Sequence, residues 1–139
     1  MKTALVTGAA GFLGSHLCDE LLEKGYNVIG IDNFFRGKKE NLPVNSNFKF
    51  YEIDLVNEDI SKIVIDENPD IVFHYAAING TEYFYDIPTK VFNDNIEITK
   101  NVLSSIKNSN VKKVIYTSTS EVYGDNPPLP TPENHMIQL

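Results

Sequence analysis

The segment TSTSEVYG, residues 117–124, combines several hydroxyl side chains with one carboxylate. It follows directly on the run VKKVIYT, whose apolar residues are typical of a buried β-strand. Hydroxyl groups can hydrogen-bond a reacting oxygen, and a carboxylate can transfer a proton. Their position at the end of a strand therefore indicates a reaction site.

A second chemical feature is the glycine series in TGAAGFLG, residues 7–14, with the spacing GxxGxxG. Gly8 would allow a sharp turn out of the preceding strand, Gly11 would let a pyrophosphate approach the backbone, and Gly14 would let the next helix pack closely on the sheet. The N-terminus of that helix would offer free N–H groups to phosphates. A triphosphate-binding loop is disfavoured because no GK[ST] follows. An S-adenosylmethionine methyltransferase is disfavoured because the GxGxG spacing is absent. The alternative to a dinucleotide-binding loop is a purely structural turn.

An acidic residue, Asp32, ends the second predicted strand eighteen residues after Gly14. A carboxylate at this position can accept both hydroxyls of an adenosine ribose and would repel a 2′-phosphate. The pattern therefore favours NAD over NADP. Arg36 and Lys38 in the next loop weaken this preference, because a cation there can reach a phosphate.

Apolar runs alternate with helical patterns along the chain. The predicted strands are Thr3–Thr7, Asn27–Asp32, Phe48–Ile53, Ile71–His74 and Val111–Thr117. The predicted helices are Phe12–Lys24, which Gly25 ends, Asn57–Asn68 and Pro88–Asn108. This alternation predicts an α/β fold, a doubly wound Rossmann-type parallel sheet of five strands in the order 3-2-1-4-5.

Length and composition limit the possible classes of protein. The 139 residues correspond to about one domain. We expect that domain to occupy residues 1–124, and residues 125–139, with four of the seven prolines, to form an irregular tail. A net charge of −7 argues against binding a nucleic-acid backbone. The single cysteine, Cys18, excludes an internal disulfide, and the lack of a signal peptide or a long apolar run predicts a cytoplasmic protein without membrane contact.

The sequence as a whole resembles the extended short-chain dehydrogenase/reductase family, which includes NAD-dependent nucleotide-sugar epimerases, dehydratases and decarboxylases. TGAAGFLG matches the TGxxGxxG of this family, DNFFRG at 32–37 is similar to its ribose-binding segment, and HYAA at 74–77 is similar to the HxAA that lines the cofactor. The resemblance implies that the cofactor-binding residues are Gly8, Gly11, Phe12, Leu13, Gly14, Asp32, Asn33, Arg36, Asp54, Leu55, Tyr75, Ala76, Ala77 and Asn95. His74 is interpreted as a packing residue at the strand end.

The same resemblance implies catalytic roles within TSTSEVYG. Thr119 matches the family hydroxyl that hydrogen-bonds the reacting sugar oxygen, while Ser120 and Glu121 bear on the subclass. Family 4-epimerases tend to carry a small apolar residue and a threonine there, whereas an acid at 121 is similar to dehydratases and, most closely, UDP-glucuronate decarboxylases. The alternative is that Glu121 caps the loop or forms an ion pair within it. The implied reaction starts with hydride transfer from sugar C4 to NAD and passes through a 4-keto intermediate.

The base that this chemistry needs is missing from the sequence. The family uses YxxxK, and none of the seven tyrosines has a lysine four residues later. We therefore expect the N-terminal portion of a longer enzyme, without its later strands and substrate domain, and inactive on its own. For the full-length protein the resemblance implies a nucleotide-sugar substrate and a homodimer, and no metal is expected. A non-catalytic NAD-binding module, complete at 139 residues, is the alternative.

Overall fold

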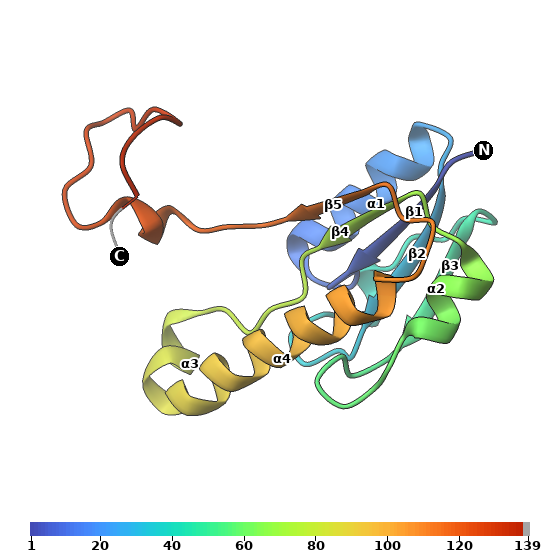
Figure 1. Cartoon of the computed structure of the whole chain (residues 1–139), viewed down its shortest axis with the longest axis horizontal. Coiled ribbons are helices and arrows are strands. Elements are labelled where there is room, and N and C mark those ends of the chain that lie inside the picture. Colours follow the sequence, from blue (N-terminus) through green and yellow to red (C-terminus); the bar gives the residue numbers. More distant parts are fainter. Residues whose placement is uncertain (138–139) are drawn as a thin grey trace.

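The computed structural model describes residues 1–137 and contains a five-stranded parallel sheet (Figure 1). The order across the sheet is β3-β2-β1-β4-β5, and every neighbouring pair is parallel. The strands are β1 (Thr3–Thr7), β2 (Asn27–Asp32), β3 (Phe48–Glu52), β4 (Ile71–His74) and β5 (Lys113–Tyr116). The predicted class and strand order are confirmed. Because the order reverses beside β1, a crevice forms at the carboxyl ends of β1 and β4.

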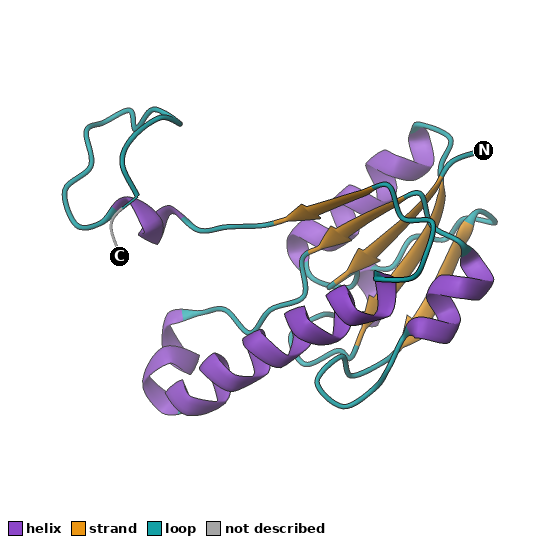
Figure 2. Cartoon of the chain, viewed as in Figure 1, coloured by secondary structure: helices purple, strands orange, loops and turns teal. Residues whose placement is uncertain are grey.

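Helices cover both faces of this sheet (Figure 2). Helix α1 (Phe12–Glu23) lies on one face, and α2 (Ser61–Glu67) and α4 (Pro88–Ile106) lie on the other. Helix α1 ends where Gly25 adopts a positive φ of 79°, which confirms the predicted stop. Helix α4 begins with proline, whose missing N–H costs nothing in the first turn.

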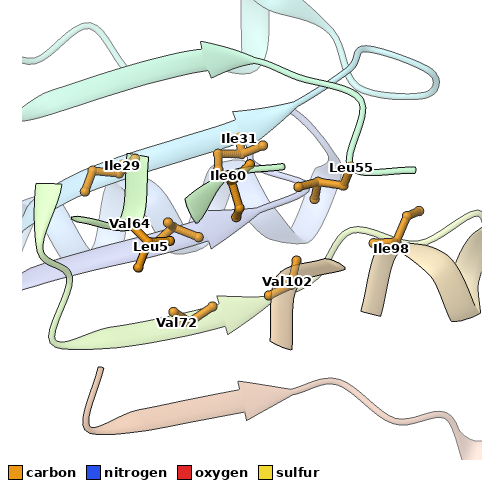
Figure 3. Packing of buried hydrophobic residues seen from close by; sticks show 9 residues of the cluster. All are labelled: Leu5, Ile29, Ile31, Leu55, Ile60, Val64, Val72, Ile98 and Val102. Atoms are coloured by element: carbon orange, nitrogen blue, oxygen red, sulfur yellow. The ribbon is translucent and has the colours of Figure 1, made fainter. Parts of the chain in front are cut away.

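The larger apolar core lies between the sheet and helices α2 and α4 (Figure 3). Side chains alternate along β1, so Leu5 points into this core while Ala4 and Val6 pack on the α1 side. The nine buried residues of the larger core are Leu5, Ile29, Ile31, Leu55, Ile60, Val64, Val72, Ile98 and Val102. Cys18 of α1 is buried in the opposite layer, and burial raises the pKa of its thiol to about 12. It therefore acts as a small apolar residue.

The predicted helix Asn57–Asn68 is wrong at its start, because α2 begins at Ser61. The Asp54 carbonyl accepts the N–H groups of Asn57 and Glu58, at 3.0 and 2.9 Å. The Asp54 side chain also accepts the Val56 N–H, at 3.1 Å. After this separate turn, the Asp59 side chain accepts the Ser61 N–H at 2.8 Å, and α2 begins there.

Three short helices lie outside the predicted helices. They are α3 (Thr81–Asp86) and the 3-10 helices η1 (Lys39–Asn41) and η2 (Ser120–Tyr123). None is long enough to show a helical apolar period. Residues 125–137 contain no helix or strand, and residues 138 and 139 of the predicted tail lie outside the described residues.

One face of α4 is apolar and exposed. Phe92, Ile96 and Leu103 are uncovered on it, and Tyr116 of β5 is exposed as well. No helix within residues 1–137 has the length and apolar character to cross a membrane.

Candidate functional site

A tight glycine turn joins β1 to α1 at the crevice. Gly8 has a φ of 71°, and a Cβ there would lie 2.9 Å from the backbone nitrogen of Ala76. A Cβ on Gly14 would lie 2.0 Å from the Gly8 carbonyl oxygen. Neither position accepts a side chain without displacing backbone. At Gly14 the close contact is with the turn that leaves β1.

The first turn of α1 is open to a ligand. Gly11 is its N-cap, no side chain caps it, and its first turn carries no acidic residue. The N–H groups of Phe12 and Leu13 therefore need an external partner, and an anion suits both their geometry and the helix dipole. Both side chains are exposed and leave the turn accessible. This uncapped cradle of small residues fits the pyrophosphate of a dinucleotide.

The hydroxyl of Thr7, the last residue of β1, connects the glycine turn to the segment after β4. Thr7 Oγ1 accepts the N–H groups of Tyr75 and Ala76, both at 3.1 Å. It also lies 2.8 Å from Nδ1 of His74. Two accepted bonds use both lone pairs of the hydroxyl, so its own hydrogen must point to Nδ1. Nδ1 of His74 therefore accepts this hydrogen bond, and the neutral imidazole carries its proton on Nε2.

The polar chain continues from His74 into α4. Nε2 donates to Thr99 Oγ1 at 3.3 Å, and the Thr99 hydroxyl donates to the Asn95 carbonyl at 2.9 Å. The Asn95 side chain then binds the backbone of Ile78 twice, accepting its N–H at 2.7 Å and donating to its carbonyl at 3.0 Å. Asn95 therefore positions the segment after β4, and both ends of its amide have partners.

Burial lowers the pKa of His74 from 6.5 to about 4. Its side chain is only 3% exposed, so the charged form would lose its hydration. A neutral imidazole accepts at one nitrogen and donates at the other, as the two threonine contacts require. The interpretation of His74 as a packing residue agrees with this environment.

Asp32, at the end of β2, organises the loop over the turn. Its Oδ2 accepts the Ala10 N–H at 3.0 Å, and its Oδ1 accepts the Phe34 N–H at 2.7 Å. These two bonds leave lone pairs on both oxygens for ribose hydroxyls. Among residues 1–137, Asp32 has no ion-pair partner, and Lys38 pairs with Glu40 at 3.6 Å instead.

The segments after β2 and β3 contribute Asn33, Asp54 and Leu55 to the cleft. Asn33 Nδ2 donates to Asp54 Oδ1 at 3.4 Å, which joins the loops after β2 and β3. The Leu55 side chain is buried in the larger core. Leu55 therefore anchors the segment after β3, which borders the cleft.

These segments surround one cleft with a volume of about 1440 Å³. All the predicted cofactor residues line it, namely Gly8, Gly11, Phe12, Leu13, Gly14, Asp32, Asn33, Arg36, Asp54, Leu55, Tyr75, Ala76, Ala77 and Asn95. The fold thus gathers them from separate parts of the sequence. In the part of the chain from 1 to 137, no three His, Cys, Asp or Glu side chains are placed to hold a metal.

The predicted catalytic residues lie on the segment after β5. The chain projects away from the sheet after β5, and η2 lies on this projection (Figure 1). Thr119 and Glu121 line the outer part of the cleft, whereas Ser120 does not. Thr119 Oγ1 accepts the Glu121 N–H at 3.3 Å and so caps η2. The capping role belongs to Thr119, and within residues 1–137 Glu121 forms no ion pair.

Sequence reasoning missed the role of Thr7. The signal was present, because a hydroxyl residue directly precedes Gly8. Its partners are separated from it by 67 to 69 residues, and only the pairing of β1 with β4 brings them together.

Comparison with known proteins identifies the family. Residues 4–138 match the model of the NAD dependent epimerase/dehydratase family. This chain belongs to that family. The resemblance drawn from the sequence is confirmed, and NAD is the cofactor of the family.

Individual relatives of the family act on UDP-linked sugars, according to their names. The chain is 37% identical to UDP-glucose 4-epimerase of Mycolicibacterium smegmatis, over 96% of this chain and 44% of the relative. It is 37% identical to UDP-N-acetyl-alpha-D-glucosaminuronate decarboxylase of Bacillus cytotoxicus, over 91% and 39%. A crystal structure of UDP-glucose 4-epimerase from Thermotoga maritima, with UDP-glucose, superimposes with a TM-score of 0.87 at 39% identity, covering 98% of this chain and 44% of that one. The chain thus spans about two fifths of the length of these relatives.

The buried His74 predicts acid sensitivity. Between pH 6.5 and about 4, an unfolded chain holds a proton on this imidazole that the folded chain excludes. The free energy of unfolding should therefore fall as pH drops through this range, by about 2 kcal/mol between pH 7 and pH 5. Urea unfolding at pH 7 and pH 5 measures this fall in the free energy of unfolding. The fall should be smaller by this amount in His74→Gln, whereas His16→Gln, which changes an exposed histidine, should show the same fall as wild type. If the free energy of unfolding fell equally with pH in wild type and His74→Gln, His74 would not be the source of the acid sensitivity.

Proposed function

We propose that this chain binds NAD and forms the cofactor-binding part of an enzyme that modifies a nucleotide-linked sugar. The observation that carries the proposal is the cleft in which the uncapped α1 terminus, the glycine turn and Asp32 converge. Bound NAD would supply a hydride acceptor for oxidation at sugar C4. The family and the UDP-sugar relatives support the substrate class.

Each part of the cleft has a defined task in this proposal. The N–H groups at Phe12 and Leu13 would bind the pyrophosphate, and Asp32 would accept the adenosine ribose hydroxyls. Ala76 and Ala77 expose backbone that a flat ring can approach. The carboxylate of Asp32 disfavours a 2′-phosphate, so NADP is the weaker ligand.

The subclass that we propose is similar to the UDP-glucuronate decarboxylases. Glu121 supports it, because an acid beside the Thr119 hydroxyl can manage a proton after the first hydride step. Relatives of both kinds, epimerase and decarboxylase, resemble the chain to the same degree, at 37% identity. Glu121 is therefore the discriminating feature.

A homodimer is also proposed for the full-length protein, and the exposed apolar face of α4 supports it. Sedimentation of a full-length protein as a monomer would exclude it. A cytoplasmic location and the lack of nucleic-acid partners stay predictions from the sequence.

A non-catalytic NAD-binding module is the second candidate function. The cleft supports it, because all the predicted cofactor residues lie within the 139 residues. The two candidates differ in whether the coding sequence continues past Leu139 into a segment with YxxxK.

Substitution of Asp32 tests the cofactor site. Asp32→Ala removes a charged hydrogen-bond acceptor and should weaken NAD binding by about tenfold to a hundredfold. It should also narrow the preference over NADP, because the repulsion of a 2′-phosphate is lost. Calorimetric titration measures both, with Asp66→Ala, which removes an exposed carboxylate outside the cleft, as the control. Unchanged NAD affinity in Asp32→Ala would exclude the assigned role.

Turnover by the 139-residue chain should be undetectable with NAD and UDP-glucuronate or UDP-glucose. The physical reason is that no lysine-activated tyrosine is present to remove the hydroxyl proton. Chromatography of the nucleotide-sugar products measures it, with a full-length epimerase as the positive control. Product formation by the chain itself would show that another group serves as the base.

A further inference from the structure

Arg36 connects the two sides of the cofactor cleft. Its guanidinium donates through Nη1 to the backbone carbonyl of Asn79 and lies 5.5 Å from the centre of the Tyr83 ring. Phe35 adds a second contact, because its ring lies 5.4 Å from that of Tyr83. A hydrogen bond from a cation and a cation–π contact thus act on the same two segments.

The strand order places this connection over the glycine turn. Arg36 follows β2, while Asn79 and Tyr83 follow β4. Strand β1 lies between β2 and β4, and the glycine turn begins at its carboxyl end. A side chain that joins the loops after β2 and β4 must therefore pass across the crevice above this turn.

The backbone next to the contact is adapted to it. Gly80 has a φ of 135°, which side-chain-bearing residues rarely adopt. A Cβ on Gly80 would lie 3.3 Å from Arg36 Nη1. Glycine here allows the guanidinium to reach the Asn79 carbonyl, and Tyr83, half-buried on α3, provides the ring beneath it.

We propose that Arg36, with Asn79 and Tyr83, forms a clasp that closes the cleft over the pyrophosphate of bound NAD and controls how fast the dinucleotide enters and leaves. The proposal rests on the proposed binding of NAD. In this proposal Arg36 is a positioning residue that joins the two sides of the cleft. Its guanidinium contacts Asn79 and Tyr83 and does not bind a phosphate of the cofactor. Such a clasp suits a protein that retains its cofactor.

The test is the kinetics of NADH binding to the chain, followed by stopped-flow fluorescence. A clasp that is closed in both the free and the bound chain slows both directions. Arg36→Met should therefore raise the association and dissociation rates together by about tenfold, leaving Kd within about threefold of wild type. Tyr83→Leu removes the cation–π contact but leaves the hydrogen bond to Asn79, so it should raise both rates by a smaller factor without removing a charge. The double variant should be about as fast as Arg36→Met, because Arg36→Met already removes both contacts of the guanidinium.

Lys39→Met is the matched control, because it removes a cation from the same loop, and within residues 1–137 its side chain forms no ion pair. It should leave both rates unchanged, and thermal unfolding should confirm that every variant is folded. The clasp would be overturned if Arg36→Met raised only the dissociation rate while Tyr83→Leu behaved as wild type, since Arg36 would then be a direct phosphate ligand. Unchanged rates in both variants would also overturn it. Absence of NADH binding by the wild-type chain would instead refute the proposed function, and the clasp with it.

Discussion

The hydroxyl of Thr7 fixes the position of the two segments between which a cofactor must lie. It binds the N–H groups of Tyr75 and Ala76 and donates to His74, so β1 and β4 end in a common hydrogen-bonded joint. Gly8 follows immediately and passes so close to this joint that no side chain fits. The turn, the open α1 terminus and the wall after β4 depend on one another through this contact.

The joint also determines the electrostatic character of the cleft floor. His74 is neutral because it is buried and because Thr7 donates to its Nδ1. The polar chain that starts there passes through Thr99 and ends at Asn95, which holds the Ile78 peptide. At the glycine turn, the α1 terminus offers backbone N–H groups and Asp32 offers a carboxylate. This separation matches a dinucleotide, whose phosphates and ribose hydroxyls need opposite partners.

The sequence predicted most of the fold, because its signals are local. Buried parallel strands give continuous apolar runs, and Gly25 gives a helix stop. The glycine spacing and Asp32 identified the cleft for the same reason. The start of α2 was wrong because a separate turn forms after Asp54 and the Asp59 side chain accepts the Ser61 N–H, where the helix begins. Thr7 and the contact of Arg36 with Tyr83 escaped prediction because both join residues that only the sheet order brings together.

The most direct test of this account is calorimetric titration of NAD into Thr7→Val and Thr7→Ser. Valine keeps the shape of Thr7 but removes the hydroxyl. The Ala76 N–H then loses its partner, and the Tyr75 N–H keeps only its longer bond to the Thr7 carbonyl, at 3.3 Å. The account predicts that folded Thr7→Val loses at least about tenfold in NAD affinity, since one lost buried bond is worth roughly 1–3 kcal/mol. Thr7→Ser should bind as wild type does. Wild-type affinity in Thr7→Val would show that the cleft does not depend on this joint.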